Sequence, residues 1–589
     1  MIAQLTQHRR LAALASFLSL SLLAFHYTTG TVQGASFHYN LSWYEGFRNA
    51  FWQGELYPRF LPDLWYGMGG ADFYFYGPLP FWLTATFGEA VCPGCSTSQT
   101  FSVSAAWMMI LSGVTFFIFA RRFFKPAWAG FGAILYVFLP MHYLVTWYVA
   151  QTVGTILALA ILPLLALAVT KLIEEKKGGV LFTATFTAMA LTHLPTTLLV
   201  GHLLAVCILW AAFTRESAWR GRFAFIMRFA PWGLLGAALS AIYWLPALAL
   251  LDTVSSEMLY TSYYDATKWL FFDGLPENDP YEANLYKWPL FLAVFSAIAA
   301  GSILYNKPER ASLFLWAVVP SLLVLFLMSI LSYPVWKFWI INKVQFPYRS
   351  MVLADLSIAL SAVVIVRNFA RHWGDKAAMR SRLLAVFGAF ALFFAFLGPL
   401  QKSAEVTAKG WGETEAFLPV APPEYIPPRF IELALERFRA KATDDDNNAE
   451  RYLMFFEEMR LGYQAALEAF EADAPGAVLI PQINERMTLI TDLPEATRVR
   501  LPLSAWTFWR AELSDGTPLD LSINQDLGVL EAALPAGPTT VNLTLIETVP
   551  QRIGTGITFF ALLVSLFWGA LVVYRRRKGQ KNSFATSIA

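Results

Sequence analysis

The stretch "FSVSAAWMMILSGVTFFIFARR", residues 101–122, determines the kind of fold this chain adopts. Residues 101–120 carry no charge and are long enough to match the roughly 20 residues that a helix needs to cross a bilayer. The whole chain is 56% hydrophobic and 15% charged, whereas soluble proteins carry about 25% charged residues. We therefore expect a polytopic α-helical membrane protein with about 12 transmembrane helices. The apolar runs are 11–27, 101–120, 127–148, 151–171, 180–195, 197–213, 224–250, 287–305, 311–331, 348–366, 383–400 and 556–574.

Basic clusters test this topology, because Lys and Arg accumulate on the cytoplasmic side of membrane proteins. The clusters are His8 to Arg10, Arg121 to Lys125, Lys171 to Lys177, Arg215 to Arg228, Lys307 to Arg310, Arg367 to Arg382 and Arg575 to Lys578. All of them fall inside if both termini are cytoplasmic. We therefore expect an integral membrane protein with both termini in the cytoplasm. The run 78–91 is too short to span and is read as interfacial or re-entrant. The first run also fits a signal peptide, but a retained helix is favoured because the following loop needs a tether.

The predicted outer segments are 28–100, 252–286, 332–347 and 401–555. Three units follow: a transmembrane core, 1–400, with its first outer loop at 28–100; a soluble outer domain, 401–555; and a final helix with a basic cytoplasmic tail, 556–589. Within the soluble domain, 429–440 and 449–473 show helical apolar spacing. Short strands with hairpin signals such as Asp515-Gly516 follow, which predicts an α+β module ending in a small β-sandwich-like part.

The first outer loop combines a surface helix with an aromatic stretch. Residues 38–54 have the spacing of an amphipathic helix lying on the membrane. Residues 55–82 then mix aromatics, glycine and proline, and the "GMGG" within them is a turn and not a P-loop. Nucleic-acid binding is set aside, because no basic aromatic patch occurs. Cys92 and Cys95 form a disulfide or free thiols, with redox or metal chemistry the less favoured alternative, and Cys207 is expected to pack in the core.

Carboxylates in the first outer loop are the candidates for chemistry. Glu45 lies on the polar side of the surface helix beside Arg48, and Asp72 precedes "FYFYGPLPFW". This apolar stretch could bury Asp72 and raise its pKa by desolvation. Either carboxylate could act as a general base or bind a divalent ion, while simple solvation is the competing explanation for each. The metal ligands, and whether a metal is needed, stay open.

Further polar residues could bind substrate. "LTHLPTT" contains His193, for which an interfacial or core hydrogen-bonding role is the favoured alternative. "VQFPYRS" contains Gln345 and Arg349 at the outer mouth of a span. A bidentate arginine such as Arg59 or Arg349 suits a phosphate, although a structural contact explains Arg349 equally well. The full set of candidate substrate-binding residues is Arg48, Arg59, Asp63, Tyr74, Tyr76, His193, Gln345 and Arg349.

The sequence resembles the GT-C superfamily of membrane glycosyltransferases. Within it, the nearest resemblance is to the bacterial family labelled 6-pyruvoyl-tetrahydropterin-synthase-related membrane proteins, with YfhO-like relatives. The residues that carry it are "GELYPRFLPDLWYGMGGADFYFYGPLPFW" (54–82), "LTHLP" (191–195), "VQFPYR" (344–349) and a pattern between Trp509 and Gly554. The resemblance implies a catalytic carboxylate in the first outer loop, often within an acidic pair. This chain has no such pair, so Glu45, the nearest carboxylate, is the first candidate and Asp72 the second.

The resemblance also implies the activity. We expect a transferase of the bacterial cytoplasmic (inner) membrane that moves a sugar from a polyprenyl-phosphate donor to an envelope glycan or lipid acceptor, with its active face extracytoplasmic. Its expected partners are membrane lipid, the donor and the acceptor. Aromatics of 65–82 would stack on sugar rings. Two alternatives remain open: a flippase or transporter of lipid-linked sugars, and a degenerate GT-C scaffold in envelope assembly. Transporters commonly show internal repeats, and none is visible here.

Overall fold

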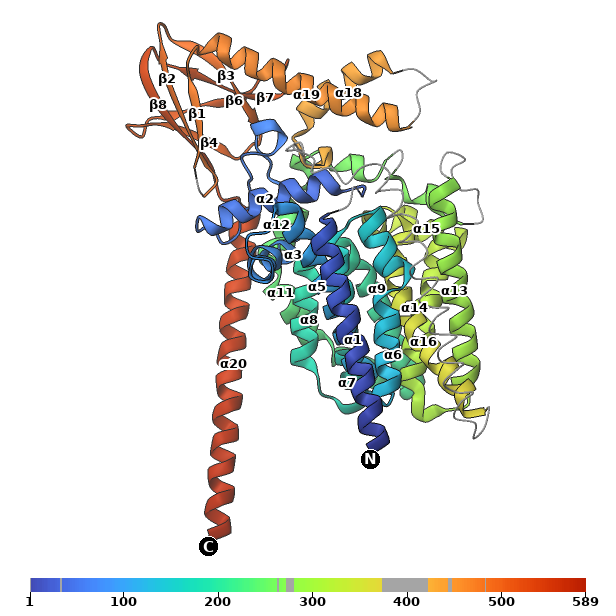
Figure 1. The fold of residues 1–589 in the computed structure, drawn as a ribbon. Helices are drawn as coiled ribbons and strands as arrows, with labels where there is room; N and C mark the ends of the chain where they lie inside the picture. Colours follow the sequence, from blue (N-terminus) through green and yellow to red (C-terminus); the bar gives the residue numbers. More distant parts are fainter. Residues whose placement is uncertain are drawn as a thin grey trace.

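The computed structural model describes residues 2–31, 34–261, 264–271, 280–372, 422–442, 448–482 and 484–588. The predicted span 383–400 lies outside the described residues. A bundle of long helices carries a β-rich module at one end, and both chain termini lie at the other end (Figure 1). We call the first end the module end and the second the terminus end.

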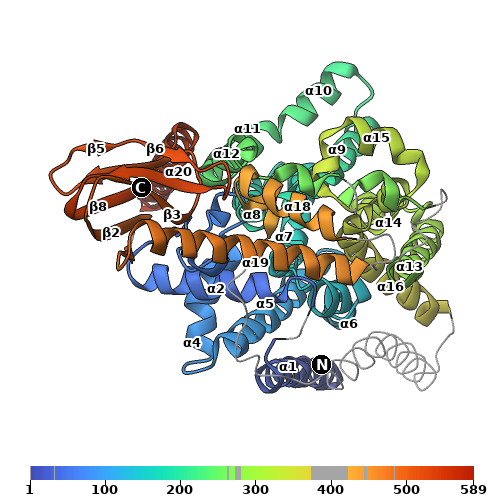
Figure 2. The ribbon, with the colours of Figure 1, turned by 90° about the horizontal axis from the view of Figure 1, so that it is seen from above.

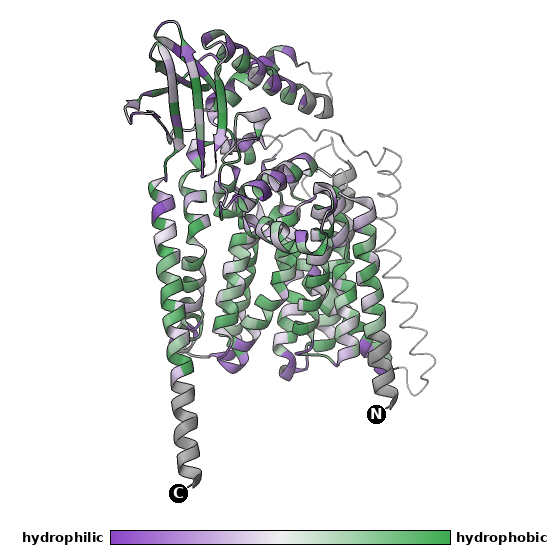
Figure 3. Ribbon diagram, turned by 60° about the vertical axis from the view of Figure 1, so that its left-hand side comes forward, coloured by the Kyte–Doolittle hydropathy of each residue, from purple (hydrophilic) through white to green (hydrophobic). Residues whose placement is uncertain are grey.

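The helices of the bundle follow the predicted apolar runs closely. Within the described residues, eight helices are long and apolar enough to cross a membrane, or nine if one bent pair counts as a span. Hydrophobic residues fill the middle of the bundle and hydrophilic ones gather at its ends (Figure 3). The long helices are α1 (Ile2–Thr29), α5 (Thr97–Ala120), α6 (Pro126–Val137) with its continuation Pro140–Val149, α7 (Val153–Glu175), α9 (Leu194–Arg215), α14 (Ala311–Met328), α16 (Met351–His372) and α20 (Val549–Ile588).

The predicted count of about 12 spans is not confirmed. The runs at 180–195 and 287–305 contain only short apolar helices, Gly179–Thr192 (α8) and the Pro289–Leu304 part of α13 (Pro280–Leu304). The run 224–250 is broken, because α10 (Trp219–Met227) and α11 (Ala230–Leu239) meet α12 (Ala241–Ala249) at a bend of 74°. Three of the predicted apolar runs therefore do not form straight, full-length spans in the described residues.

Several polar side chains inside the bundle hydrogen-bond to one another, which satisfies groups that lipid cannot. The Trp316 indole donates to the Thr170 hydroxyl at 2.9 Å, which ties α14 to α7. The Ser321 and Ser357 hydroxyls meet at 2.8 Å between α14 and α16. Cys207 of α9 is fully buried in the same core, as predicted.

Helix α20 stands apart from the bundle over most of its length (Figure 1). Near its start, the Thr558 hydroxyl accepts from the backbone N–H of Ile242 at 2.9 Å and donates to the carbonyl of Ala238 at 3.1 Å. A Cβ on Gly554 would lie 2.4 Å from the carbonyl oxygen of Ala241, so the two backbones touch there. The remaining apolar surface of α20 is exposed and suited to lipid.

The module consists of two helices and two antiparallel sheets. Helices α18 (Pro428–Lys441) and α19 (Asn448–Asp473) match the predicted helical segments. One sheet has the order β1-β2-β8-β4-β5 and the other β3-β7-β6, with inward residues such as Leu489 and Val499 buried between them. The strands are β1 (Val478–Gln482), β2 (Arg486–Leu493), β3 (Thr497–Ser504), β4 (Trp509–Leu513), β5 (Pro518–Leu519), β6 (Leu521–Ile523), β7 (Val529–Leu534) and β8 (Gly537–Leu545).

The first loop lies between the bundle and the module. Helix α2 (Phe37–Trp52) runs beneath α19, seen from the side in Figure 1 and from above in Figure 2. The aromatic stretch then forms short turns, including Asp72–Tyr74, before α3 (Leu79–Leu83) and α4 (Glu89–Val91). Its backbone supports the module, because the Ser504 hydroxyl donates to the carbonyl of Gly69 at 2.7 Å. A Cβ on Gly69 would also clash with the Phe60 ring, at 2.1 Å. The stretch is therefore a buried platform for the sandwich.

Candidate functional site

Asp72 lies at the centre of the aromatic stretch and has no exposed surface. Its Oδ1 accepts a hydrogen bond from the Trp43 indole of α2 at 3.0 Å. Its Oδ2 is buried without a partner among the described residues, pressed so close to Gly70 that a Cβ there would be 2.3 Å away. Burial raises the pKa of Asp72 to about 8, as the flanking apolar residues predicted. This carboxyl group is therefore poised to change its charge near neutral pH.

A second carboxylate, Glu424, acts on Asp72. It belongs to the short turn Pro423–Tyr425, in the Pro-rich segment that leads into the module. Its negative charge adds to the upward shift of the pKa of Asp72, after the larger effect of burial. Burial likewise raises the pKa of Glu424 itself to about 7, and the positive charge of Arg349 opposes that shift. Through these charge effects the two acids and Arg349 form one electrostatic unit, which we call the Asp72 cluster.

Aromatic side chains surround this unit. The Trp43 ring lies 4.4 Å from that of Tyr76 and 6.3 Å from that of Tyr425, measured between centroids. The Tyr76 ring is in turn 6.3 Å from His193, which begins α9 and shares a 2.8 Å hydrogen bond with Thr196. Four sequence candidates thus gather here: Asp72, Tyr76, His193 and Arg349.

Glu424 is the residue that the sequence reasoning missed. It lies in "APPEYIPP", residues 421–428, outside both the first loop and the predicted helices of the soluble domain. A lone carboxylate between two pairs of prolines is a signal for a rigid, positioned acid. The charge effect on Asp72 links segments far apart in the chain, and such a long-range relation leaves no local pattern.

Arg349 is held at the start of α16 by local contacts. Its guanidinium donates to the carbonyl of Val344 at 3.1 Å and lies 5.3 Å from the centre of the Phe346 ring. Gln345, which lies between Val344 and Phe346 in the chain, is buried and has a positive φ of 73°. Such a conformation is uncommon outside glycine and turns the chain sharply ahead of Arg349.

Two other candidates, Arg59 and Tyr74, lie in a separate polar cluster at the base of the module. The Arg59 guanidinium is buried, donates to the carbonyl of Ile242 at 3.2 Å and lies 4.1 Å from the Tyr57 ring centre. The Tyr74 hydroxyl donates to Gln551 at the start of α20, at 3.0 Å. Burial raises the pKa of Glu485 to about 7, and Arg59 is the neighbouring charge that opposes this shift. This cluster joins the loop, the module and α20.

The remaining candidates lie away from Asp72. On α2, successive residues are about 100° apart, so Glu45 points away from the face that presents Trp43. Glu45 is half-buried and forms no ion pair within the described part of the chain, and Asp63 is exposed. Arg48 pairs with Glu89 at 3.5 Å, and the Tyr44 hydroxyl donates to the same carboxylate at 2.6 Å.

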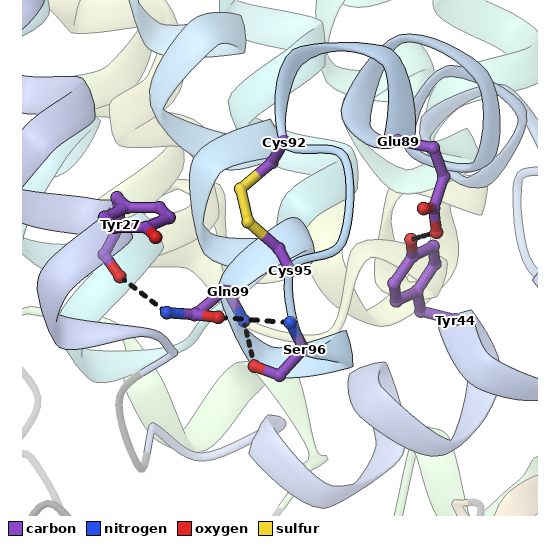
Figure 4. Close-up of a disulfide and its surroundings, with 7 residues drawn as sticks. All are labelled: Tyr27, Tyr44, Glu89, Cys92, Cys95, Ser96 and Gln99. Carbon is purple, nitrogen blue, oxygen red and sulfur yellow. Dashed lines mark hydrogen bonds between the residues drawn. A yellow bond between two sulfur atoms is a disulfide. The ribbon is translucent and has the colours of Figure 1, made fainter.

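A disulfide lies next to this contact. Cys92 and Cys95 are bonded to each other at the turn between α4 and α5 (Figure 4). Ser96 caps α5 by accepting from the backbone of Gln99 at 3.3 Å, and the Gln99 side chain returns a bond to Ser96 and reaches the carbonyl of Tyr27 in α1. The disulfide therefore closes a turn that anchors α1 to α5.

Groups of three or more His, Cys, Asp or Glu side chains arranged to hold a metal are absent from the described residues. Asp72 and Glu424 offer two carboxylates. A hard divalent cation bound by them would need water or substrate oxygens to complete its coordination.

No protein-family model and no curated protein sequence matches the chain. Solved structures do show a likeness. The apo oligosaccharyltransferase of Archaeoglobus fulgidus has a TM-score of 0.40 at 13% identity, over 76% of this chain and 59% of its own. The arabinofuranosyltransferase AftD from mycobacteria has a TM-score of 0.42 at 16% identity, over 92% of this chain and 40% of its own.

A third similar structure is ArnT from Cupriavidus metallidurans bound to undecaprenyl phosphate, with a TM-score of 0.28 at 11% identity, over 61% of this chain and 78% of its own. These proteins are GT-C glycosyltransferases, the class that the sequence resembles, whereas the narrower YfhO-like family is not confirmed. The likeness is too distant to carry an argument about this chain's reaction. The functional conclusion therefore depends on the residues around Asp72.

Proposed function

We propose that this chain is a membrane glycosyltransferase that moves a sugar from a polyprenyl-phosphate donor to an envelope glycan or lipid acceptor. The observation that carries the proposal is Asp72, a fully buried acid whose Oδ2 has no hydrogen-bond partner among the described residues. The charge of Glu424 acts on Asp72, and that of Arg349 acts on Glu424. A general base works best when its pKa lies near the operating pH. A plain structural carboxylate would instead have its oxygens satisfied.

The proposed active face is extracytoplasmic. Arg122 follows α5 at the terminus end, where it pairs with Glu174 of α7 at 2.6 Å. Lys177 follows α7 at the same end. Basic residues at that end favour a cytoplasmic location for it by the positive-inside rule. The module end, with Asp72, would then face outwards.

In the proposed reaction, the acceptor hydroxyl loses its proton to Asp72 as its oxygen attacks the anomeric carbon of the donor sugar. The bond from that carbon to the carrier phosphate breaks, and polyprenyl phosphate leaves with the bonding electrons. Arg349 binds the phosphate and stabilises its growing charge. Because Asp72 is fully buried, substrate reaches it only when the surrounding side chains move.

The other residues have supporting roles in this proposal. Tyr76 and Trp43 offer rings on which a sugar can pack, and His193 borders the same space. Glu424 keeps the pKa of Asp72 raised. If a divalent ion takes part, Asp72 and Glu424 would be its protein ligands, and chelation by EDTA would abolish transfer.

The experiment is complementation of a deletion strain, read out by envelope glycan composition. Wild-type protein should restore the missing sugar, whereas Asp72→Asn should reduce transfer by about 10²-fold or more, the usual contribution of a general base. Asp515→Asn, which changes an exposed carboxylate in the β4–β5 turn of the module, is the control and should restore transfer fully.

The same strain separates the alternatives. Full activity of Asp72→Asn, with the protein present at its normal level, would exclude the catalytic proposal. Lipid-linked sugar trapped on the cytoplasmic side of the deletion strain would favour a flippase. Unchanged glycans with disordered envelope assembly would favour a scaffold.

A further inference from the structure

A cavity of about 240 Å³ opens at the module end of the bundle, outside the Asp72 cluster. Three short elements form it: the turn Ala266–Trp269, helix α15 (Tyr333–Phe338) and the turn Ile340–Val344. Its volume lies below the roughly 300 Å³ at which pockets for drug-sized ligands begin. The space therefore suits a ligand about as large as one sugar ring.

The lining of this cavity is polar, aromatic and balanced in charge. Asp265 supplies a carboxylate whose Oδ1 accepts from the Thr267 hydroxyl at 2.8 Å. Lys337 supplies an ammonium group that donates to the Tyr333 hydroxyl at 3.0 Å. Asn342 adds an amide whose oxygen is buried without a partner among the described residues. The rings of Tyr260 and Tyr333 form walls, and the Lys343 ammonium lies 3.7 Å from the centre of the Tyr260 ring.

These groups define the chemistry of the ligand. Opposite charges on Asp265 and Lys337 disfavour an anion or a cation alone, because either would meet a like charge. Hydroxyl groups can donate to Asp265 and Asn342 and accept from Lys337. The apolar face of a sugar ring can pack against the tyrosines. A neutral saccharide combines all three properties.

The cavity is linked to the Asp72 cluster through two contacts. Tyr260 follows the turn Ser256–Leu259, and the preceding Ser255 donates its backbone N–H to Ile426, two residues after Glu424, at 3.0 Å. On the other side, the Trp269 ring lies 5.1 Å from Phe346, which stacks under the Arg349 guanidinium. Both walls of the cavity thus join elements that hold Glu424 and Arg349.

We infer that this cavity is a subsite for a neutral sugar ring of the acceptor saccharide, placed next to the site of transfer. The assignment of this sugar to the acceptor rests on the proposed function. Binding of the sugar itself depends only on the cavity. Lys337 and Asn342 are specificity residues here, and neither touches the reacting atoms.

Binding is measured by saturation-transfer NMR on the purified full chain in lipid nanodiscs, without any donor. The probes are D-glucose, D-galactose, D-mannose, L-arabinose and N-acetyl-D-glucosamine, with glucose 6-phosphate as the charged comparison. We expect at least one neutral sugar to bind. Lys337→Met and Asn342→Leu should each weaken its Kd about tenfold, or about 1.4 kcal/mol.

Lys268→Met is the matched control, because Lys268 is an exposed neighbour on the same turn and does not line the cavity. Its Kd should stay within about twofold of wild type. Thr267→Val, a nearly isosteric change in the lining, replaces either variant that fails to fold. Absence of neutral sugar binding, tighter binding of glucose 6-phosphate, or unchanged affinity in the lining variants would overturn the inference.

The two proposals fail separately. Sugar binding that depends on Lys337 in a chain with no transferase activity keeps the subsite and removes the transferase. Transfer that depends on Asp72, combined with no binding in this cavity, does the reverse.

Discussion

Asp72 is fully buried, and its carboxyl group is also the proposed base of the reaction. Removing it from water raises its pKa, while the single hydrogen bond from Trp43 favours the ionised form and lowers the pKa. A base accepts a proton only when it is ionised. The rate of transfer should therefore rise with pH through about 8 and then level off.

This balance predicts the effect of Trp43→Phe. The variant keeps a ring but loses the donor to Asp72, so the pKa of Asp72 should rise and the rate–pH profile should move to higher pH. Trp65→Phe is the control, because its buried indole N–H has no partner in the described structure. Initial rates between pH 6 and 10 give the rate–pH profile of each variant. A Trp43→Phe profile that coincides with wild type would show that Asp72 is not the titrating base.

At the scale of elements, the aromatic stretch is held against the bundle by backbone contact. A Cβ on Gly77 would lie 2.3 Å from the carbonyl oxygen of Thr192, at the end of α8, and neither backbone can yield easily. The turn that carries Asp72 and Tyr76 is therefore positioned by close packing, with glycine required at its exit.

Gly77→Ala should accordingly lower the thermal midpoint and reduce activity, because the turn must move away from α8. Overpacking of this kind typically costs about 1–3 kcal/mol. Gly201→Ala, in α9 where a Cβ meets nothing within 4 Å, should be neutral or slightly stabilising. Thermal unfolding followed by tryptophan fluorescence compares them. Equal midpoints for the two variants would contradict the packing account.

Elements with strong local signals were predicted well from the sequence. Helices α2, α18 and α19 and the hairpins after residue 497 carry periodicity or turn residues that identify them. Strands β1 and β2 were missed. β1 contains Pro481, which weakens its strand signal but is tolerated because β1 lies at the edge of its sheet. β2 does carry a strand signal, because its buried residues Met487, Leu489 and Leu493 are spaced by even numbers of residues.

The candidate site was only partly predictable for a different reason. Asp72, Tyr76, His193 and Arg349 could each be singled out by type and local context. Their grouping, and the addition of Glu424, depends on contacts between segments that are distant in the chain. Glu45 was favoured by its nearness to the first span, a criterion that ignores which face of α2 it occupies.

At the scale of the whole molecule, the account requires the module and the termini to lie on opposite sides of the membrane. A single cysteine introduced by Asp515→Cys, in the exposed β4–β5 turn, should react with an impermeant maleimide in intact spheroplasts. Lys177→Cys, at the terminus end, should react only after permeabilisation. The reverse pattern would place Asp72 on the cytoplasmic side and exclude an extracytoplasmic reaction.

The most direct measurement is conversion of the native donor. Lipid-linked sugars that accumulate in a deletion strain are extracted and incubated with purified protein and delipidated envelope glycan, and polyprenyl phosphate is quantified by mass spectrometry. The account predicts that wild-type protein releases polyprenyl phosphate in step with glycan modification, and that Asp72→Asn is at least about 10²-fold slower. Release at equal rates by both proteins, or by neither, would contradict it.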